Sequence, residues 1–593
     1  LISDFQKLSP VLDAVKEIED LLGFDKLDIE FAIDEESTVH IFQVRPIVVD
    51  HSEFEYNFEK FRETIELNLS FFNKKNDESN EKYGQNIVFS NMPDWNPAEI
   101  IGTKPFPLSF SLYRELITEK VWSIQRNEFG YKMVDESPLI ISLSGQPYVD
   151  CSMSFNSFIP SDISDNLANK LTGAYLLILS NNPDLFDKVE FDVALTSWTP
   201  DFKIQAKERL CPIGISSQEI SILENALKAI TSSAITNLDK HIQNVNKLKR
   251  IRDKIFRSKM SQLQKINFLI EDCKKFGTLP FAHAARHGFI ATAFLKSFVA
   301  MKIISDSRFQ EFFNNVSTVA TDFEIDISNN YMGNVTNQEM IEKYGHLRPG
   351  TYEISVEPYW RNPEKYLFGK KFMPQAQNKS FKFTSIEKDK IRNVLNELDS
   401  NIGMQEFMEY LTKSIQERER VKFEFTKILS LALDNILDWG LEKGINKDDI
   451  KFIEYKDLQD DSVTNDVDSI KKIIEKNKNS YIYTNIVQLP PLINKLENFY
   501  CFENSKLSPN FVTNKKTISR IEIDIDSSST NLKDKIVMIE RADPGFDWIF
   551  NQGISGLITK YGGANSHMAI RSAEIGIPAA IGVGEALFEK LKL

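Results

Sequence analysis

A histidine near the C-terminus lies in a sequence suited to phosphoryl chemistry. His567 follows Ser566, the glycine pair Gly562-Gly563 and an apolar run over residues 556–559. The run predicts a buried strand, the glycines a sharp turn, and the segment after them an amphipathic helix that begins near His567. The first turn of a helix has free N–H groups and the positive end of the helix dipole, which together suit a phosphoryl group.

The imidazole of His567 is a competent nucleophile that can carry a group between two half-reactions. We therefore expect His567 to become a phosphohistidine. The groups expected to bind phosphate beside it are the hydroxyls and backbone amides of Thr559, Gly562, Gly563 and Ser566. The alternative is a core histidine that serves only the strand–turn–helix unit.

A second set of polar residues lies near the N-terminus. Residues 28–34 and 39–46 alternate apolar and polar side chains, which predicts a β-hairpin. One strand carries Asp28, Glu30 and Asp34 on one face, and the other carries Gln43 and Arg45 on one face. A carboxylate and an amide near an arginine could hold a metal-bound triphosphate, because Mg²⁺ prefers oxygen ligands and arginine pairs with phosphate. The alternative is an edge hairpin with a solvated polar face.

Four polar clusters lie in the middle of the chain and contain candidate acceptor-binding residues. Arginine binds carboxylate or phosphate bidentately, and a carboxylate can bind an amino or hydroxyl group. Two of the histidines are four residues apart on one predicted helix face, a spacing that could also bind a metal. For each residue a structural ion pair or a place in the core is the alternative. The candidates are Glu99, Arg114, Asn156, His283, Arg286, His287, His346, Arg348 and Glu353.

The whole chain has the composition of a globular protein of several domains. It has 593 residues, 42% hydrophobic and 26% charged, with a formal net charge of −14. That charge argues against nucleic acid or an anionic membrane as a general partner. Four scattered cysteines, no long apolar span and no signal peptide favour a reducing cytoplasm. The chain starts without Met, inside a predicted helix, so we expect a fragment of something longer.

The elements that must position these residues divide the chain into three predicted domains. They cover residues 1–50, 51–488 and 489–593. Helical patterns dominate 215–275 and 385–445, whereas 456–480 is expected to be a solvated connector.

Three segments resemble parts of one enzyme superfamily. The stretch from Thr559 to Gly582 closely resembles the phosphohistidine swivel domain of phosphoenolpyruvate-utilising enzymes. "DIEFAID…IFQVRPI" looks like the closing hairpin of an ATP-grasp domain, which implies Mg²⁺ at Glu30 and Gln43 and ATP phosphates at Arg45. The middle section, with "GHLRPGTYEI", is similar to the substrate domain of kinases related to rifampin phosphotransferase, particularly the L-glutamine kinases of bacterial capsule pathways.

The resemblance implies a multidomain α+β fold: the end of an ATP-grasp domain, a large mainly helical substrate domain and a small α/β swivel domain. Its implied activity is an ATP-dependent phosphotransferase that converts ATP, L-glutamine and water to AMP, phosphate and amide-phosphorylated glutamine for capsule phosphoramidate. A base such as His283, His287 or Glu353, and a carboxylate-binding Arg286 or Arg348, would serve the acceptor. Because the rest of the ATP-grasp domain is expected to be missing, this chain alone should bind ATP poorly. An antibiotic or pyruvate as acceptor, or a non-catalytic regulatory relic, remains an alternative.

Overall fold

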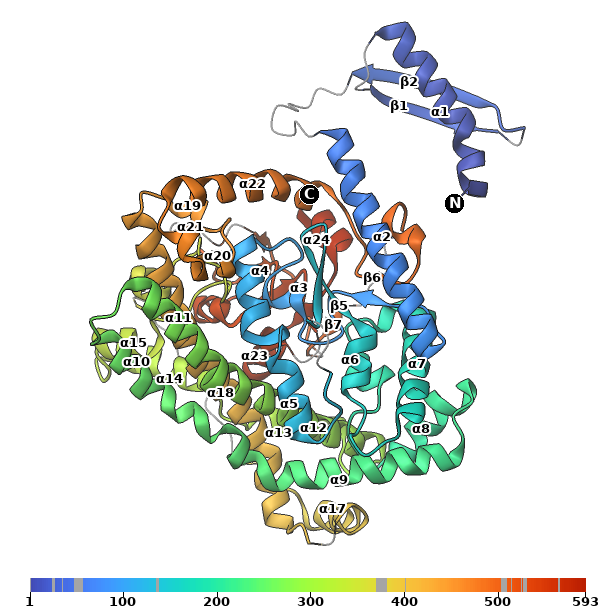
Figure 1. The fold of residues 1–593 in the computed structure, drawn as a ribbon. Helices are drawn as coiled ribbons and strands as arrows, with labels where there is room; N and C mark the ends of the chain where they lie inside the picture. Colours follow the sequence, from blue (N-terminus) through green and yellow to red (C-terminus); the bar gives the residue numbers. More distant parts are fainter. Residues whose placement is uncertain are drawn as a thin grey trace.

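The computed structural model divides the protein into an N-terminal unit, a large helical unit and a C-terminal unit (Figure 1). The described residues are 2–23, 27–34, 36–46, 57–134, 138–368, 381–399, 401–502, 509–513, 515–523, 525, 531–563 and 566–592. Over these ranges the chain is mainly helical with small sheets, in agreement with the predicted α+β class.

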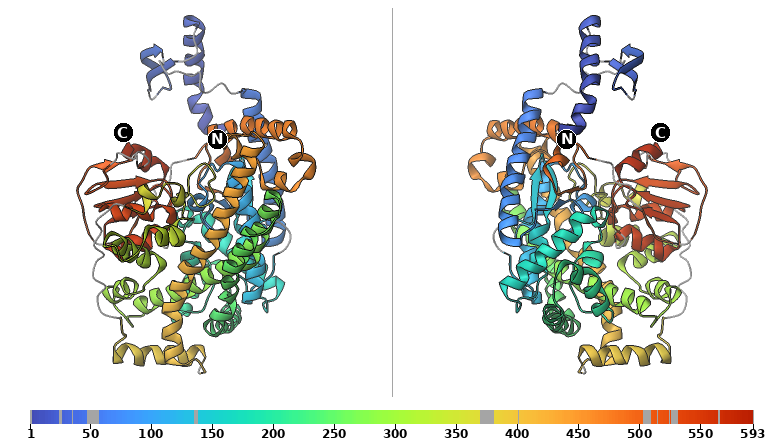
Figure 2. Two further views of the ribbon diagram at one scale, coloured as in Figure 1. Left: turned by 90° about the vertical axis from the view of Figure 1, so that its left-hand side faces the viewer. Right: turned by 90° about the vertical axis from the view of Figure 1, so that its right-hand side faces the viewer.

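The N-terminal unit is a helix beside a β-hairpin, and it stands apart from the rest of the molecule in Figures 1 and 2. Helix α1 (Ile2–Leu22) precedes strands β1 (Leu27–Ile33) and β2 (Val39–Pro46). The strands pair antiparallel, which confirms the predicted hairpin.

The helical unit is built from helices that pack around two long central ones, α12 and α18. Local capping fixes many helix starts; Ser216, for example, exchanges hydrogen bonds with Glu219 in a capping box. The helices of its first part are α2 (Phe58–Tyr83), α3 (Pro97–Ile100), α4 (Pro107–Tyr113), α5 (Val121–Phe129), α6 (Cys151–Ser157), α7 (Asp165–Asn181), α8 (Phe202–Leu210), α9 (Ser217–Ile242), α10 (Leu248–Phe256) and α11 (Gln262–Cys273). Those of its second part are α12 (Leu279–Ala300), α13 (Asp306–Asn314), α14 (Val319–Tyr331), α15 (Asn337–Tyr344), α16 (Pro363–Tyr366), α17 (Ser385–Leu398), α18 (Met404–Glu442), α19 (Lys447–Ile450), α20 (Tyr455–Gln459), α21 (Asp461–Thr464) and α22 (Val467–Ile486).

One predicted loop is instead helical. Residues 456–480, expected to be a solvated connector, contribute to α20, α21 and α22. The polar composition was misleading because apolar residues are spaced along one helix face, where Ile470 and Ile474 are buried.

A small antiparallel sheet crosses the helical unit. Its strand order is β4 (Ile140–Leu143), β5 (Gln146–Asp150), β3 (Phe89–Ser90), β6 (Leu492–Ile493). Because β6 pairs with β3, residues 492–493 lie in the helical unit, although the sequence places a domain boundary at 488/489. Phe499 packs in the same small core, so this unit extends beyond β6.

The C-terminal unit is a five-stranded sheet with helices against it. The strand order is β7 (Asn510–Phe511), β11 (Ala579–Ile581), β10 (Gly556–Thr559), β9 (Ile536–Ile539), β8 (Ile521–Glu522). All neighbours are parallel except β7 and β11. The helical segments are η10 (Pro544–Gln552), α23 (His567–Ile575) and α24 (Glu585–Lys592).

The C-terminal unit is docked on the helical unit through a shared apolar core. Trp548 packs edge-on against Tyr366, with ring centroids 5.5 Å apart. The hydroxyl of Tyr359 donates to the carbonyl of Gly545 at 2.5 Å. At Gly545 an added Cβ would lie 1.9 Å from the carbonyl oxygen of Arg348, so the two backbones touch. This contact fixes the position of η10 and, through it, of the C-terminal unit.

No helix in the described part of the chain is both long enough and apolar enough to span a lipid bilayer.

Candidate functional site

His567 is the first residue of α23, just after β10 and the glycine turn. The hydroxyl of Ser566 caps the helix by accepting from the backbone N–H of Ala569 at 3.3 Å. Gly562 has a φ of +145°, and an added Cβ would come within 2.9 Å of Ala542 and Ile581. Only glycine therefore fits the turn. This geometry confirms the predicted strand–turn–helix.

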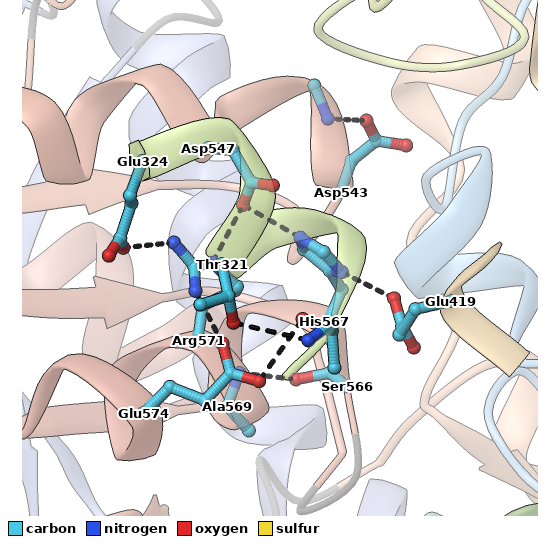
Figure 3. Close-up of polar contacts among 12 residues, drawn as sticks. Thr321, Glu324, Glu419, Asp543, Asp547, Ser566, His567, Ala569, Arg571 and Glu574 are labelled. Carbon is cyan, nitrogen blue, oxygen red and sulfur yellow. Dashed lines mark hydrogen bonds and ion pairs between the residues drawn. The ribbon is translucent and has the colours of Figure 1, made fainter. Parts of the chain in front are cut away.

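Two carboxylates hold the ring of His567 (Figure 3). Nε2 lies 2.7 Å from Oδ1 of Asp547 in η10, and Nδ1 lies 3.0 Å from Oε2 of Glu419 on α18. Burial by itself lowers the pKa of His567, but the charge of Asp547 and hydrogen bonds to both carboxylates raise that pKa to about 9. Burial opposes ionisation of Glu419, yet the hydrogen bond from His567 brings its pKa down to about 2. In this docked position His567 is an imidazolium at neutral pH.

Arg571, one turn further along α23, extends this charge network. Its guanidinium pairs with Glu324 on α14 and with Glu574, and its Nε lies 3.6 Å from Oδ1 of Asp547 (Figure 3). Asp547 thus lies between the imidazole of His567 and the guanidinium of Arg571, and these contacts hold it in place against the ring.

The glycine turn also contacts the helical unit. The backbone N–H of Gly563 donates to Oε2 of Glu99 on α3 at 3.3 Å. The side-chain amide of Asn96 lies 3.5 Å from the same oxygen. Burial raises the pKa of Glu99 above its usual range. A buried carboxyl that gains protons readily therefore lies beside the turn that precedes His567.

A cavity of about 520 Å³ opens beside His567. The helical unit supplies most of its wall, from the loop after β3, α3, α5, α12, α18 and the π-helical segment η4 (Val189–Val193). The C-terminal unit closes one side with Gly563, Ser566 and His567. Its volume suits a small molecule. Charged side chains of both signs line the cavity: Asp94, Glu99, Arg126, Asp187, Lys188, Glu190, Asp192, Arg286, Lys296, Arg418 and Lys422.

Comparison with known families identifies the C-terminal unit. Residues 532–592 match the family description "PEP-utilising enzyme, mobile domain". The C-terminal unit is similar to the mobile domain of PEP-utilising enzymes, and we call it the mobile domain. The match supports membership of this superfamily and indicates a phosphotransferase of the phosphohistidine type. A search of curated proteins finds no match to the chain.

Within the mobile domain, the four predicted phosphate-binding residues have different surroundings. Gly563 and Ser566 line the cavity beside His567, whereas Gly562 lines a neighbouring cleft. Thr559 is fully buried, and its hydroxyl accepts from the backbone N–H of Gly582 at 3.0 Å. Its contact in the structure is therefore with the loop after β11.

Of the nine candidate acceptor residues, Glu99 and Arg286 line the cavity beside the mobile domain's histidine. Arg114 pairs with Glu119 and is not among the cavity's lining residues. Asn156 lies on α6 and does not line the cavity either.

The two histidines of α12 belong to a buried aromatic cluster. Nε2 of His283 lies 2.8 Å from Oε2 of Glu128, and Nε2 of His287 lies 2.9 Å from Nδ1 of His241. Neither lines the cavity. Burial lowers the pKa of His287 well below its usual value. Across the described residues, no group of three His, Cys, Asp or Glu side chains is arranged to hold a metal ion.

The segment with His346, Arg348 and Glu353 contacts the mobile domain. Arg348 donates to Asp434 at 2.9 Å and to the backbone carbonyls of Glu353 and Val356. Glu353 accepts from the hydroxyl of Ser355 at 2.7 Å. These contacts shape the loop that lies against Gly545. His346 and Arg348 line a second, small cavity of about 40 Å³, which His567 also lines.

The hairpin residues lie together on the N-terminal unit. Glu30 and Gln43 are opposite each other in the strand register, and Arg45 donates to Asp28 at 2.9 Å and to Glu30 at 3.1 Å. Carboxylate and amide oxygens facing each other fit the ligand preference of Mg²⁺.

The sequence analysis missed Glu419 and Asp547, the two residues nearest to His567. Glu419 lies within a long amphipathic helix among many Lys and Glu residues, and no local pattern marks it. Asp547 sits in a short helical segment of the mobile domain, 20 residues before His567. The one sequence signal for Asp547 is that it is an acidic residue in the same domain as His567.

Proposed function

We propose that this protein is an ATP-dependent phosphotransferase that carries the phosphoryl group on His567 and transfers it to L-glutamine. The observation that carries the proposal is the position of His567. This mobile-domain residue lines a charged cavity of about 520 Å³, whose wall comes mostly from the helical unit. This arrangement corresponds to the second half-reaction, in which the carrier meets the acceptor.

The first half-reaction requires a neutral imidazole, and the docked ring is protonated. Undocking removes Glu419 and so favours loss of that proton. Glu30 and Gln43 would hold Mg²⁺, which neutralises triphosphate charge when bound. Arg45 would then orient ATP phosphate oxygens. Following the superfamily, the ring of His567 would attack the β-phosphorus as its bond to AMP breaks. Water would then cleave the γ-phosphate as inorganic phosphate, and the β-phosphoryl group would stay on His567.

In the second half-reaction the amide nitrogen of glutamine attacks phosphorus. The new N–P bond forms as the bond from phosphorus to the ring nitrogen of His567 breaks, and the electron pair returns to the ring. The ring takes up a proton, as its carboxylate partners Asp547 and Glu419 favour. Glu99, with its raised pKa, would accept the proton that the amide nitrogen loses.

The charged lining of the cavity favours a small polar acceptor over an apolar antibiotic. An amide nitrogen is a weak nucleophile, so positioning and a nearby base matter more than for a hydroxyl. The choice of glutamine among small polar acceptors rests on the sequence resemblance.

The test is ³¹P NMR of the natural full-length protein with Mg·ATP, with and without L-glutamine. We expect AMP, phosphate and a phosphoramidate resonance that requires glutamine. ATP turnover without that resonance would reject glutamine and keep the phosphohistidine. Absence of turnover would reject the kinase and favour a regulatory relic.

A further inference from the structure

Three buried charges and one partly buried charge form the part of the cavity wall made by α5, α12, η4 and the loop after β3. Arg126 on α5 donates through Nη2 to both carboxylate oxygens of Asp94 at 3.2 Å. Arg286 on α12 pairs with Glu190 in η4, and its Nη2 donates to the hydroxyl of Thr196 at 2.7 Å. We call Asp94, Arg126, Glu190 and Arg286 the charge tetrad.

The tetrad is compact. The guanidinium groups of Arg126 and Arg286 both lie over the ring of Phe158, at 3.9 Å and 5.2 Å from its centroid. Asp94 and Arg126 both act electrostatically on Glu190. Two positive and two negative groups therefore share one small region. Burying charges carries a large desolvation penalty, which is offset only where the pairs have good geometry and the remaining donors and acceptors find partners.

The tetrad keeps unused hydrogen-bonding capacity. Arg126 and Arg286 are only 3% and 2% exposed, yet the Nε–H of each has no hydrogen-bond partner among the described residues. Such unsatisfied buried donors are costly unless a ligand or water takes them up. Both arginines line the cavity and therefore border the space that a ligand would fill.

The backbone beside the tetrad is strained. Trp95 and Asn96 follow Asp94 with φ values of +55° and +33°, which non-glycine residues rarely adopt. Both residues line the cavity, and the buried indole Nε1 of Trp95 also has no partner in the described structure. Strain of this kind is retained where the surroundings impose a required geometry.

We propose that the charge tetrad binds the carboxylate and ammonium groups of a zwitterionic α-amino acid acceptor. Arg126 and Arg286 bind the carboxylate, and Asp94 and Glu190 bind the ammonium group. A ligand of zero net charge leaves the balance of the tetrad unchanged, whereas a dianion or a dication adds an uncompensated buried charge. The side chain of the amino acid then extends within the cavity toward His567. This inference rests on the proposed function and adds the site that binds the acceptor's α-carboxylate and α-ammonium groups.

The experiment follows discharge of the phosphoryl group from the natural full-length protein after labelling with Mg·[β-³²P]ATP. L-Glutamine is compared with 4-aminobutanamide, which lacks the carboxylate, and with 4-carbamoylbutanoate, which lacks the ammonium group. We expect each analogue to discharge the protein roughly 100-fold or more slowly, because buried groups of the tetrad stay unpaired. Equal discharge by glutamine and both analogues would overturn the inference.

A double variant tests the residues themselves. Asp94→Asn with Arg126→Gln removes both charges of one pair, which is milder than removing one. We expect glutamine to discharge this variant as slowly as 4-aminobutanamide discharges the wild type. Labelling of the variant with ³²P should be retained. If the variant still discharged faster to glutamine than to 4-aminobutanamide, the role of Asp94 and Arg126 would be overturned.

The matched control is Arg308→Gln with Glu387→Gln, which neutralises another ion pair, between α13 and α17 and outside the cavity lining. Its discrimination between glutamine and the analogues should be that of the wild type. Failure of the wild type to take up label would reject the proposed function itself. Labelling without discrimination would reject only the tetrad.

Discussion

Nδ1 of His567 lies 3.0 Å from Oε2 of Glu419, and this contact joins the mobile domain to the longest helix of the helical unit. Asp547 holds the other ring nitrogen from within the mobile domain. The unphosphorylated, protonated ring therefore favours the docked arrangement. A phosphoryl group on either nitrogen would displace one carboxylate, so the charged and discharged carrier differ in their contacts.

Docking should depend on pH through this contact. The pKa of His567 is raised from 6.5 to about 9, so its contribution is complete below pH 6.5 and is lost as pH rises through 9. The pKa of Glu419 is lowered from 4.5 to about 2, so its contribution is complete above pH 4.5 and is lost as pH falls through 2. We expect the firmest docking between pH 4.5 and 6.5.

The pKa shift of His567 sets an upper limit on the docking free energy that is lost at alkaline pH. The full shift of His567 corresponds to about 3 kcal/mol. Asp547 moves with the ring, so only the part due to Glu419 changes on undocking, and the loss is smaller than this. Fluorescence energy transfer between the exposed Cys211 and a Lys590→Cys label on α24, in a Cys501→Ser background, would measure it. In Glu419→Gln the alkaline change should shrink; an unchanged profile would contradict the role of Glu419.

Gly545→Ala should block docking without unfolding the mobile domain. The new Cβ would lie 1.9 Å from the backbone oxygen of Arg348, an atom that cannot move aside easily. The variant should accept phosphate from ATP yet discharge to the acceptor at least about 100-fold more slowly, because misplacement of the reacting atoms carries that penalty. Single-turnover assays of labelling and discharge separate the two steps.

Gly563→Ala is the structural control for docking, since its Cβ would find its nearest neighbour, the carbonyl oxygen of Asp187, at 3.9 Å. Its energy-transfer signal should equal that of the wild type. Wild-type discharge by Gly545→Ala would show that transfer does not require the docking seen here.

His567→Ala should abolish labelling by [β-³²P]ATP, because His567 is the only histidine among the described residues that line the cavity. No ³²P label should be detectable on this variant. The control is His241→Gln, which removes a different, partly buried histidine outside the cavity lining. Retained labelling of His567→Ala would place the phosphoryl group on another residue.

Glu99→Gln should slow discharge to the acceptor by about 10²–10⁴-fold, the usual contribution of a general base. Labelling by ATP should persist, since Glu99 belongs to the helical unit. The pH dependence of discharge should also lose its acidic limb, and this separates loss of a base from a structural defect. A variant that keeps the wild-type pH profile would exclude Glu99 as the base.

The sequence alone determined the elements with strong local signals. Alternation predicted the hairpin that holds Glu30 opposite Gln43, and the glycine turn before Ser566 predicted the start of α23. These features depend on neighbours within a few residues, and their side-chain periodicity is visible in one dimension. Residues 456–480 were predicted incorrectly because their polar composition outweighed the spaced isoleucines that tertiary packing buries.

Only the tertiary structure decided which distant residues surround His567. Glu419 is 148 positions away in sequence, and Glu99 lies 464 positions before Gly563. Their roles come from the docking of one unit on another, and docking depends on complementary surfaces that no local pattern encodes. The same holds for the charge tetrad, because burial and the pairing of opposite charges arise only when α5, η4 and α12 pack around one cavity.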